Sequence, residues 1–504
     1  MNGKKEFGDY QTPPAFAEEV CRFLQEEKRV NPGTILEPTC GLGSFIKGSL
    51  SFHASRIYGV EINPEYCREC RSSIADERVE IINGSIFDCE LPVPGDRETL
   101  VIGNPPWVTS SALSAMGSAN LPEKSNFKGL SGIDAMTGNS NFDICEFIIE
   151  SLLYRFSQHG ATLAMLCKTT VARNVFQEMR RAGIGCEEFS LYEFDSAAVF
   201  SVSVPACLLF IKQSPQAAPP ESCTVYDFRH PGVAKSSFGY VNGEFYSDLR
   251  TAADDFNGTS CFEWRQGVKH DCAKIMELTK TPGAYRNGQK EQVELEDSLV
   301  FPLVKSSMFK SPLISSFSKY VIVTQKKPGE PTEHIRETSP KVWNYLCENA
   351  AQFNKRKSSI YANAPQFAMF GVGDYSFSRY KVGVSGFYKK PLFALLCSAD
   401  KKPVMTDDTG YFISFDSYDM AYVAMLYLNS ERVQSFLTSI AFLDSKRPYT
   451  KKVLSRLDFG KIVRRITPDE IRRTERSLSL PPRLTQGMVA RFTDTVRQRD
   501  MQLL

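Results

Sequence analysis

The sequence predicts an α/β fold built on a mainly parallel β-sheet, followed by a second domain of mixed α+β structure. Between residues 34 and 212, short apolar runs alternate with longer amphipathic segments, which is the pattern of strands joined by crossover helices. After residue 223 the alternation stops and the elements become less regular. A chain of 504 residues is also long for a single hydrophobic core, which favours two or three domains.

Seven apolar runs are the expected strands of the sheet. In order, they occupy 34–38, 56–62, 79–85, 99–104, 161–168, 188–194 and 206–212. Helical periodicity between them is clearest over 142–156. The connection between the last two runs is too short for a crossover helix, so we expect these two strands to pair antiparallel at one edge of the sheet.

The Pro/Ala/Ser-rich segment 213–223 is the expected domain boundary. We therefore expect a first domain over 1–215, a connecting region over 216–300, a second domain over 301–465 and a basic helical C-terminal tail over 466–504. The stretch 110–141 is rich in Ser, Gly and Asn and is too long for a simple connection, so we expect a mobile active-site loop there.

The composition is that of an ordinary globular protein, with 42% hydrophobic and 23% charged residues. No apolar run reaches the roughly 18 residues of a transmembrane helix, and the N-terminus lacks the apolar segment of a secretory signal. Because 14 cysteines occur without such a signal, we expect reduced thiols in a cytoplasmic protein with no membrane partner. Cys67 and Cys70 form a C-x-x-C pair, but no second pair lies at zinc-site spacing, so we expect no metal.

The net charge of +2 conceals an uneven distribution. Residues 1–300 hold 28 Lys and Arg against 40 Asp and Glu, a balance of −12. Residues 301–504 hold 32 against 18, a balance of +14. The basic second part suggests a polyanionic partner, and a solvated basic surface without a partner is the alternative.

Polar or conformationally special residues follow each of the first four predicted strands. They are Glu37, Pro38, Gly41 and Gly43, then Glu61 and Ile62, then Phe87 and Asp88, and finally Asn104, Pro105, Pro106 and Trp107. An open α/β sheet binds ligands at these strand ends, and an acidic residue there can accept hydrogen bonds from ribose hydroxyls. The acidic residues disfavour a pyrophosphate, so S-adenosylmethionine, which is cationic at sulfur, suits the site better than NAD. A helix N-cap is the alternative role for each carboxylate taken alone.

The order of five short motifs resembles the gamma class of N6-adenine DNA amino-methyltransferases. The motifs are TPP (12–14), EPTCGLG (37–43), GVEIN (59–63), SIFD (85–88) and NPPW (104–107), and the resemblance covers roughly residues 8–212. It implies a Rossmann-like methyltransferase sheet with its last strand antiparallel, S-adenosylmethionine as cofactor, and a C-terminal target-recognition domain. Two positions depart from the family pattern, since Cys40 replaces a small residue and Trp107 replaces the commoner Tyr or Phe.

The resemblance also implies roles for individual residues. Glu61 would hold the ribose, Asp88 the cofactor adenine, and Gly41 and Gly43 the methionine side, with Thr12 covering its end. The further cofactor-binding candidates are Glu37, Pro38, Ile62, Phe87 and Asn104. The Asn104 side-chain oxygen and the Pro105 carbonyl would accept the two N–H groups of the target amine, while Pro106 stiffens the loop. Trp107 and Phe200 would stack on a flipped-out adenine. A core position for Phe200 and a helix-capping role for Thr12 are the alternatives.

Basic and aromatic residues alternate over 354–390, and two further basic segments lie at 301–309 and 444–452. Basic side chains contact phosphates, and aromatic side chains can reach base edges. The candidates for contact with double-stranded DNA are Lys305, Arg356, Lys357, Tyr361, Arg379, Lys381, Lys389, Lys446 and Arg447. Each aromatic residue could equally belong to the core.

These features predict a site-specific DNA adenine-N6 methyltransferase, the modification component of a restriction-modification or phage-defence system. Its further partners would be a cognate restriction endonuclease or defence-system subunits. One alternative keeps the fold and changes the substrate to RNA or to a protein glutamine. Another is a catalytically silent subunit that supplies DNA specificity.

Overall fold

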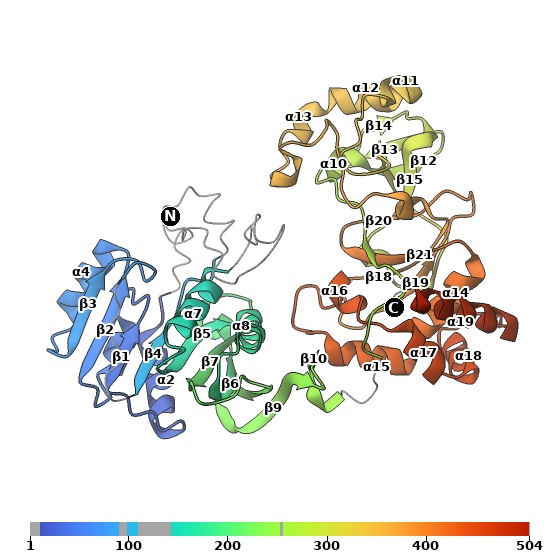
Figure 1. The fold of residues 1–504 in the computed structure, drawn as a ribbon. Coiled ribbons are helices and arrows are strands. Elements are labelled where there is room, and N and C mark those ends of the chain that lie inside the picture. Colours follow the sequence, from blue (N-terminus) through green and yellow to red (C-terminus); the bar gives the residue numbers. More distant parts are fainter. Residues whose placement is uncertain (1–10, 90–97, 109–142, 252–255, 503–504) are drawn as a thin grey trace. The chain divides into compact units, whose positions relative to one another are not determined.

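The computed structural model describes residues 11–89, 98–108, 143–251 and 256–502 (Figure 1). The loop expected at 110–141 lies outside the described residues. The chain divides into two compact units, Met1–Phe245 and Tyr246–Leu504. No helix within the described ranges is long and apolar enough to cross a membrane.

A ten-stranded sheet forms the first unit, in the order β10-β9-β8-β6-β7-β5-β4-β1-β2-β3. All seven predicted strands are present: β1 (Thr34–Glu37), β2 (Arg56–Glu61), β3 (Val79–Asn83), β4 (Thr99–Gly103), β5 (Thr162–Lys168), β6 (Cys186–Phe194) and β7 (Ala206–Gln213). The first five pair in parallel, and the strand order reverses between β1 and β4. This arrangement confirms the Rossmann-like α/β fold class.

β7 is antiparallel to both of its neighbours, β5 and β6, as predicted for the last two strands. The pair does not lie at the edge of the sheet, however. Three further strands, β8 (Ser222–Asp227), β9 (His230–Val241) and β10 (Glu244–Tyr246), extend the sheet beyond β6. β8 pairs in parallel with β6, so the Pro-rich segment 213–223 connects strands of one sheet. The compact unit therefore continues to Phe245 and does not stop at residue 215.

The helices that accompany the sheet in the described part of this unit are α2 (Pro14–Glu26), α3 (Ser44–Ser49), α4 (Pro64–Ser73), α7 (Ile144–Arg155), α8 (Thr169–Ala182) and α9 (Ser196–Phe200). Side-chain oxygens cap several of them, as Asn63 does for the Glu65 N–H (2.8 Å) and Asp143 for the Cys145 N–H (3.1 Å). The helix predicted over 142–156 is therefore present as α7.

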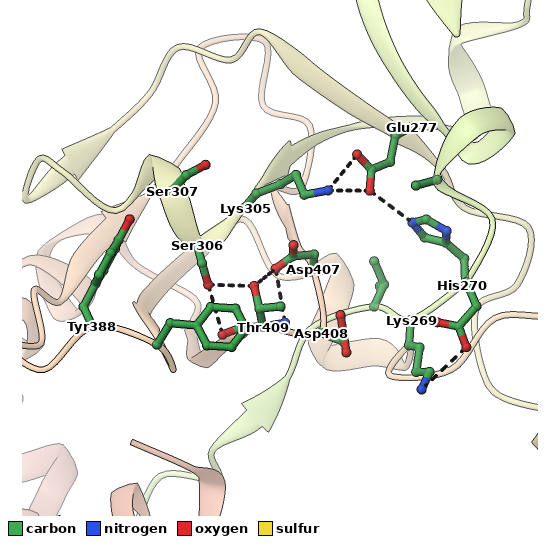
Figure 2. A pocket seen from close by; sticks show the side chains of 14 residues that line it. Lys269, His270, Glu277, Lys305, Ser306, Ser307, Tyr388, Asp407, Asp408 and Thr409 are labelled. Carbon is green, nitrogen blue, oxygen red and sulfur yellow. Dashed lines mark hydrogen bonds and ion pairs between the residues drawn. The ribbon is translucent and has the colours of Figure 1, made fainter. Parts of the chain in front are cut away.

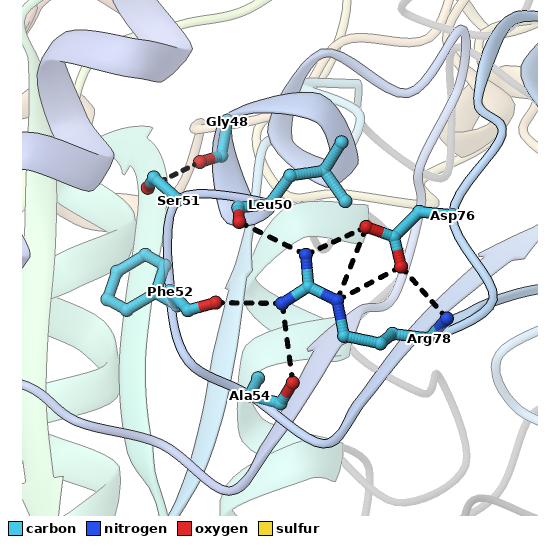
Figure 3. A network of polar contacts seen from close by, with 7 residues as sticks. All are labelled: Gly48, Leu50, Ser51, Phe52, Ala54, Asp76 and Arg78. Atoms are coloured by element: carbon cyan, nitrogen blue, oxygen red, sulfur yellow. Dashed lines mark hydrogen bonds and ion pairs between the residues drawn. The ribbon is translucent and has the colours of Figure 1, made fainter.

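Arg78 fixes the segment between α3 and β2 against the chain that leads into β3 (Figure 3). Its guanidinium donates to the carbonyls of Leu50 (3.2 Å) and Phe52 (2.9 Å) and pairs with the Asp76 carboxylate (2.8 Å). The Arg78 side-chain hydrogen bond lowers the pKa of Asp76 to about 2. These contacts satisfy carbonyls in the segment between α3 and β2.

Two smaller sheets and a set of helices form the second unit, which agrees with the predicted α+β mixture. The five-stranded sheet contains β11 (Arg265–Gln266), β21 (Gly410–Phe415), β18 (Tyr380–Ser385), β19 (Ala394–Leu396) and β16 (Leu313–Ile314). The six-stranded sheet contains β14 (Gln292–Val293), β13 (Ala284–Asn287), β12 (Glu277–Thr281), β17 (Lys319–Ile322), β15 (Val300–Val304) and β20 (Met405–Thr406).

The longest helices of this unit are α12 (Pro340–Glu348), α14 (Tyr418–Leu428), α15 (Glu431–Ile440), α18 (Pro468–Ser477) and α19 (Gln486–Met501). The tail predicted after residue 466 is helical, and it contributes Ile471, Phe492 and Val496 to the core. Trp264 lies in the same core, so the predicted connecting region 216–300 is shared between the two units.

Candidate active site

The carboxyl ends of β1, β2 and β4 meet where the strand order reverses, which is the ligand-binding position of an open α/β sheet. Glu37 ends β1, Glu61 ends β2, and Asn104 follows β4 directly. These three predicted residues therefore lie at the same side of the sheet, where the carboxyl ends of its parallel strands are. Ile62, the next residue after Glu61, is an exposed apolar side chain at 43% exposure.

The glycine-containing loop after β1 adopts a conformation that favours glycine. Gly41 and Gly43 have φ values of +53° and +81°, in the left-handed region. A Cβ atom on Gly43 would lie 2.5 Å from the Cys70 Sγ, and one on Gly41 would lie 2.7 Å from the Gln11 Oε1. Both positions therefore leave no room for a side chain without displacement of a neighbour.

Glu61 joins this loop to the end of β2. Its carboxylate accepts the Gly41 N–H through Oε2 (2.9 Å) and the Asn63 N–H through Oε1 (2.7 Å). Each carboxylate oxygen carries a second lone pair, so these bonds are compatible with acceptance of ribose hydroxyls. Glu61 therefore orders the loop and remains a suitable nucleoside acceptor.

Glu37 is buried, with 3% of its surface exposed. Its Oε2 atom has no hydrogen-bond partner among the described residues. Burial raises the pKa of Glu37 well above its usual value, and the nearby Cys70 and Glu61 add to the effect. The site thus contains a buried carboxyl oxygen that a polar ligand group can satisfy.

The two residues predicted for adenine binding follow β3. Asp88 is exposed, and Phe87 is half-buried with its ring 5.0 Å from that of Phe147 on α7. Pro38, which precedes the glycine loop in the chain, is buried. The structure therefore leaves the Asp88 carboxylate accessible to a ligand.

Thr12 connects the start of the first helix to the predicted catalytic asparagine. Its hydroxyl accepts a hydrogen bond from the Asn104 Nδ2 (3.3 Å), and its carbonyl accepts one from the Ser44 Oγ (2.7 Å). The N-cap of α2 is Pro13, without a side-chain hydrogen bond, so Thr12 does not cap this helix. Its contacts instead orient the Asn104 amide.

Trp107 and Phe200 are brought together by the fold. Their ring centroids are 5.4 Å apart at an interplanar angle of 69°, and each side chain is less than a tenth exposed. Phe200 also lies 6.3 Å from Phe16 and 6.1 Å from Phe194. Because the two rings touch, a base held between their faces would require them to move apart. Pro105 is buried and Pro106 half-buried within the same segment.

Two residues that contact this site, Gln11 and Lys168, belong to no sequence motif, so the sequence does not predict them. Gln11 accepts the Leu42 N–H through its Oε1 (3.2 Å), although it precedes the TPP motif. Lys168 donates to the Trp107 carbonyl (3.3 Å) and pairs with Asp143 (2.6 Å). The only signal for Lys168 is a cation that ends a buried strand.

A relative that covers nearly the whole chain decides the family. The Type II methyltransferase M.NspV of Nostoc sp. is 39% identical over 469 residues, which is 90% of this chain and 96% of that protein. This chain belongs to the Type II methyltransferases. The modification methylase CviBIII of Paramecium bursaria Chlorella virus NC1A is 25% identical over 42% of this chain and 51% of its own length.

No protein-family model matches the methyltransferase. Among solved structures, the type I restriction-modification methyltransferase subunit of Streptococcus thermophilus is 13% identical over 48% of this chain and 55% of its own, with a TM-score of 0.31. The methyl donor of the methyltransferase is S-adenosylmethionine. The strand-end carboxylates, the glycine loop and the exposed Ile62 fit a nucleoside with a cationic tail.

The predicted DNA-contacting residues of the methyltransferase have different surroundings. Lys357, Arg379, Lys389 and Lys446 are exposed. Arg356 is half-buried, stacks 3.8 Å from the Tyr361 ring centroid and donates to the Ala368 carbonyl (2.7 Å). Arg356 and Tyr361 thus contact each other and the protein's own backbone.

Lys381 is fully buried, which corrects the prediction that it contacts DNA. Its ammonium donates to the carbonyls of Ser376, Ser378 and Val404 at 2.8 to 2.9 Å. Burial lowers its pKa to about 7, and the three carbonyls oppose this shift because they stabilise the charged form. The lysine occurs in a basic and aromatic stretch, but its place in β18 directs it inward.

Lys305 lines a polar cavity of about 610 Å³ in the second unit (Figure 2). Its ammonium is paired with the Glu277 carboxylate (2.7 Å), beside the buried His270. Arg447 pairs with Asp408, another residue of the cavity wall (3.5 Å). Both predicted phosphate contacts therefore already have an acidic neighbour.

Proposed function

We propose that the methyltransferase is a site-specific DNA enzyme that methylates the N6 amine of a flipped-out adenine, as the modification component of a restriction-modification system. The observation that carries the proposal is the placement of the Asn104 amide. Thr12 orients this amide at the strand-order reversal, in the same crevice as Glu61 and the glycine loop.

The chemistry of an exocyclic amine explains why such an amide is useful. The lone pair of the nitrogen is delocalised into the ring, so the amine is a poor nucleophile. The Asn104 side-chain oxygen and the Pro105 carbonyl would each accept one N–H and favour a pyramidal nitrogen. Because Pro106 restricts φ, these two acceptors are held in place before the reaction. S-adenosylmethionine, when bound, supplies the electrophilic methyl group.

An adenine within a duplex cannot reach such a crevice and must leave the base stack. Stacking of a base on an aromatic side chain contributes roughly 1–3 kcal/mol. Trp107 follows the two acceptors directly in the chain, and its ring lies against Phe200. These two side chains are therefore our candidates to receive the flipped base.

The second unit is our candidate for target recognition. Residues 301–504 carry a balance of +14, and Lys357, Arg379, Lys389 and Lys446 are exposed cations within this range. Phosphate contacts of this kind position a protein on DNA, while base contacts supply the specificity.

Methyl transfer to defined substrates tests the proposal. The purified chain is incubated with radiolabelled S-adenosylmethionine and either duplex DNA, total RNA or protein, and Asn104→Ala serves as the inactive control. We expect label on DNA, as N6-methyladenine in the nucleoside digest and at one sequence in methylation-sensitive long-read sequencing. Label on RNA or protein alone, or N4-methylcytosine in the digest, would contradict the proposal. Specific DNA binding without S-adenosylmethionine binding would favour the silent specificity subunit.

A further inference from the structure

The end of β5 holds the predicted catalytic tetrapeptide at two points. β5 continues three residues beyond its last pairing with β4, which joins Met165 to Gly103, and it ends at Lys168. The Leu166 carbonyl accepts the Trp107 indole N–H (3.4 Å), and the Lys168 ammonium donates to the Trp107 carbonyl (3.3 Å). Side chain and backbone of Trp107 are thus both fixed to one strand.

Asp143 completes this arrangement from the start of α7. Its carboxylate pairs with Lys168 (2.6 Å) and also caps the helix at the Cys145 N–H (3.1 Å). The adjacent Ile144 N–H donates to the Val108 carbonyl (2.9 Å). Lys168 therefore connects the peptide after the tetrapeptide, the first turn of α7 and the end of β5.

The burial of this ion pair argues for a role in orientation. The side chains of Lys168 and Asp143 are 23% and 13% exposed. Desolvation offsets much of the attraction between charges at such burial, so an ion pair is a poor source of net stability. A directed ammonium can, however, hold a carbonyl and a carboxylate in one geometry, and its long stem lies within the protein.

We propose that Lys168 and Asp143 are a positioning pair that fixes the Trp107 peptide and thereby the direction of the Pro105 carbonyl. Pro105 and Pro106 restrict φ, so a rotation of the Trp107 peptide is transmitted to the preceding carbonyl. Misplacement of a reacting group by about 1 Å can cost about 100-fold in rate. The kinetic part of this inference rests on the proposed methyl transfer.

Two readouts of Lys168→Met test the inference, one of them independent of catalysis. We expect kcat to fall roughly 10- to 100-fold while KM for S-adenosylmethionine stays within about twofold, because the cofactor-binding strand ends are untouched. The protein contains three tryptophans, and Trp264 and Trp343 belong to the second unit. With 5-fluorotryptophan labelling, the fluorine resonance of Trp107, identified by Trp107→Phe, should shift while the other two stay in place.

Three further variants serve as a conservative substitution, a substitution of the partner residue and a control. Lys168→Arg retains a cationic donor and should recover kcat to within about tenfold of the wild type. Asp143→Asn keeps the helix cap but removes the charge pair, so it should reproduce the Trp107 shift even where Lys168→Met fails to fold. Lys212→Met removes an exposed lysine that pairs with Glu187 (2.7 Å) and should change neither readout.

The outcomes separate this inference from the proposed function. An unchanged Trp107 resonance in both Lys168→Met and Asp143→Asn would overturn the positioning role, whatever happens to the rate. A shifted resonance with unchanged kcat would overturn it as well. If the wild-type chain transfers no methyl group to DNA, the proposed function fails, and the fluorine spectrum alone decides whether the pair positions Trp107.

Discussion

Glu37 is buried at the end of β1, and its surroundings disfavour the ionised form of its carboxyl group. Burial, Cys70 and Glu61 all raise the pKa of its carboxyl, so the neutral form is favoured in the folded protein. The unfolded chain, by contrast, ionises this group near its usual pKa of about 4.5. Folding therefore opposes ionisation of Glu37.

This opposition predicts a pH-dependent difference between wild type and Glu37→Gln. As pH rises above about 4.5, the unfolded wild type loses a proton that the folded state retains, so its free energy of unfolding falls relative to the variant. The slope is at most about 1.4 kcal/mol per pH unit. Urea unfolding of both proteins between about pH 4 and 8 measures the difference. A difference that stays constant with pH would show that the pKa of Glu37 is unshifted.

Thr12 provides a second residue-scale prediction. Thr12→Val removes the hydroxyl that accepts the Asn104 amide N–H but keeps the shape of the side chain. We expect about a tenfold loss of kcat, since one hydrogen bond to an oriented group is worth about 1 kcal/mol or slightly more. Thr12→Ser should retain activity within about threefold. Equal kinetics for Val and wild type would show that Asn104 needs no such orientation.

At the scale of an element, the left-handed conformations of Gly41 and Gly43 set the path of the glycine loop between β1 and α3. Gly43 meets the buried Cys70 Sγ, whereas Gly183, at the C-cap of α8, has a similar φ of +71° and nothing within 4 Å of its missing Cβ. The two positions thus share the backbone strain and differ in the space available.

Substitution at these two glycines separates strain from steric conflict. Gly183→Ala should lower the free energy of unfolding by about 1–2 kcal/mol, the cost of the left-handed conformation alone. Gly43→Ala should cost more and should also weaken S-adenosylmethionine binding, because the loop that contacts Glu61 must shift. Thermal unfolding and calorimetric titration measure both effects. Equal losses at the two positions would exclude a steric contribution from Cys70.

Local patterns predict much of the fold, and long-range contacts explain what they miss. The seven strand runs are visible as apolar segments, and the strand-end motifs predict that Glu61, Gly41 and Asn104 end or follow neighbouring strands, where the structure has them. β8 escapes prediction because a Pro-rich segment precedes it and its pairing with β6 depends on a distant strand. Lys381 and Lys168 show the same limit, since no local pattern reveals that one points inward and the other holds Trp107.

At the scale of the whole molecule, the two units differ in charge. The exposed cations Lys357, Arg379, Lys389 and Lys446 belong to the second unit, while Lys212 in the first unit is paired with Glu187. If the exposed cations neutralise DNA phosphates, each one releases about one counterion on binding. The salt dependence of binding therefore measures how many take part.

Alanine substitution of an exposed cation that binds DNA should reduce the slope of log K against log salt by about 0.9 for each phosphate that is no longer neutralised. Lys212→Ala is the matched control and should leave the slope unchanged. Fluorescence anisotropy with a duplex that carries the methylated sequence, between about 50 and 200 mM salt, provides the measurement. A residue whose removal weakens binding without a change of slope does not bind a phosphate.

The three strands beyond β6 have a practical consequence for anyone who wishes to study the first unit by itself. A fragment cut after residue 215 would lose β8 and leave one backbone edge of β6 open, and open edges recruit other chains and cause aggregation. A fragment that extends to Phe245 keeps that edge covered. Strand pairing, and not the proline-rich segment 213–223, therefore determines where the first unit can be truncated.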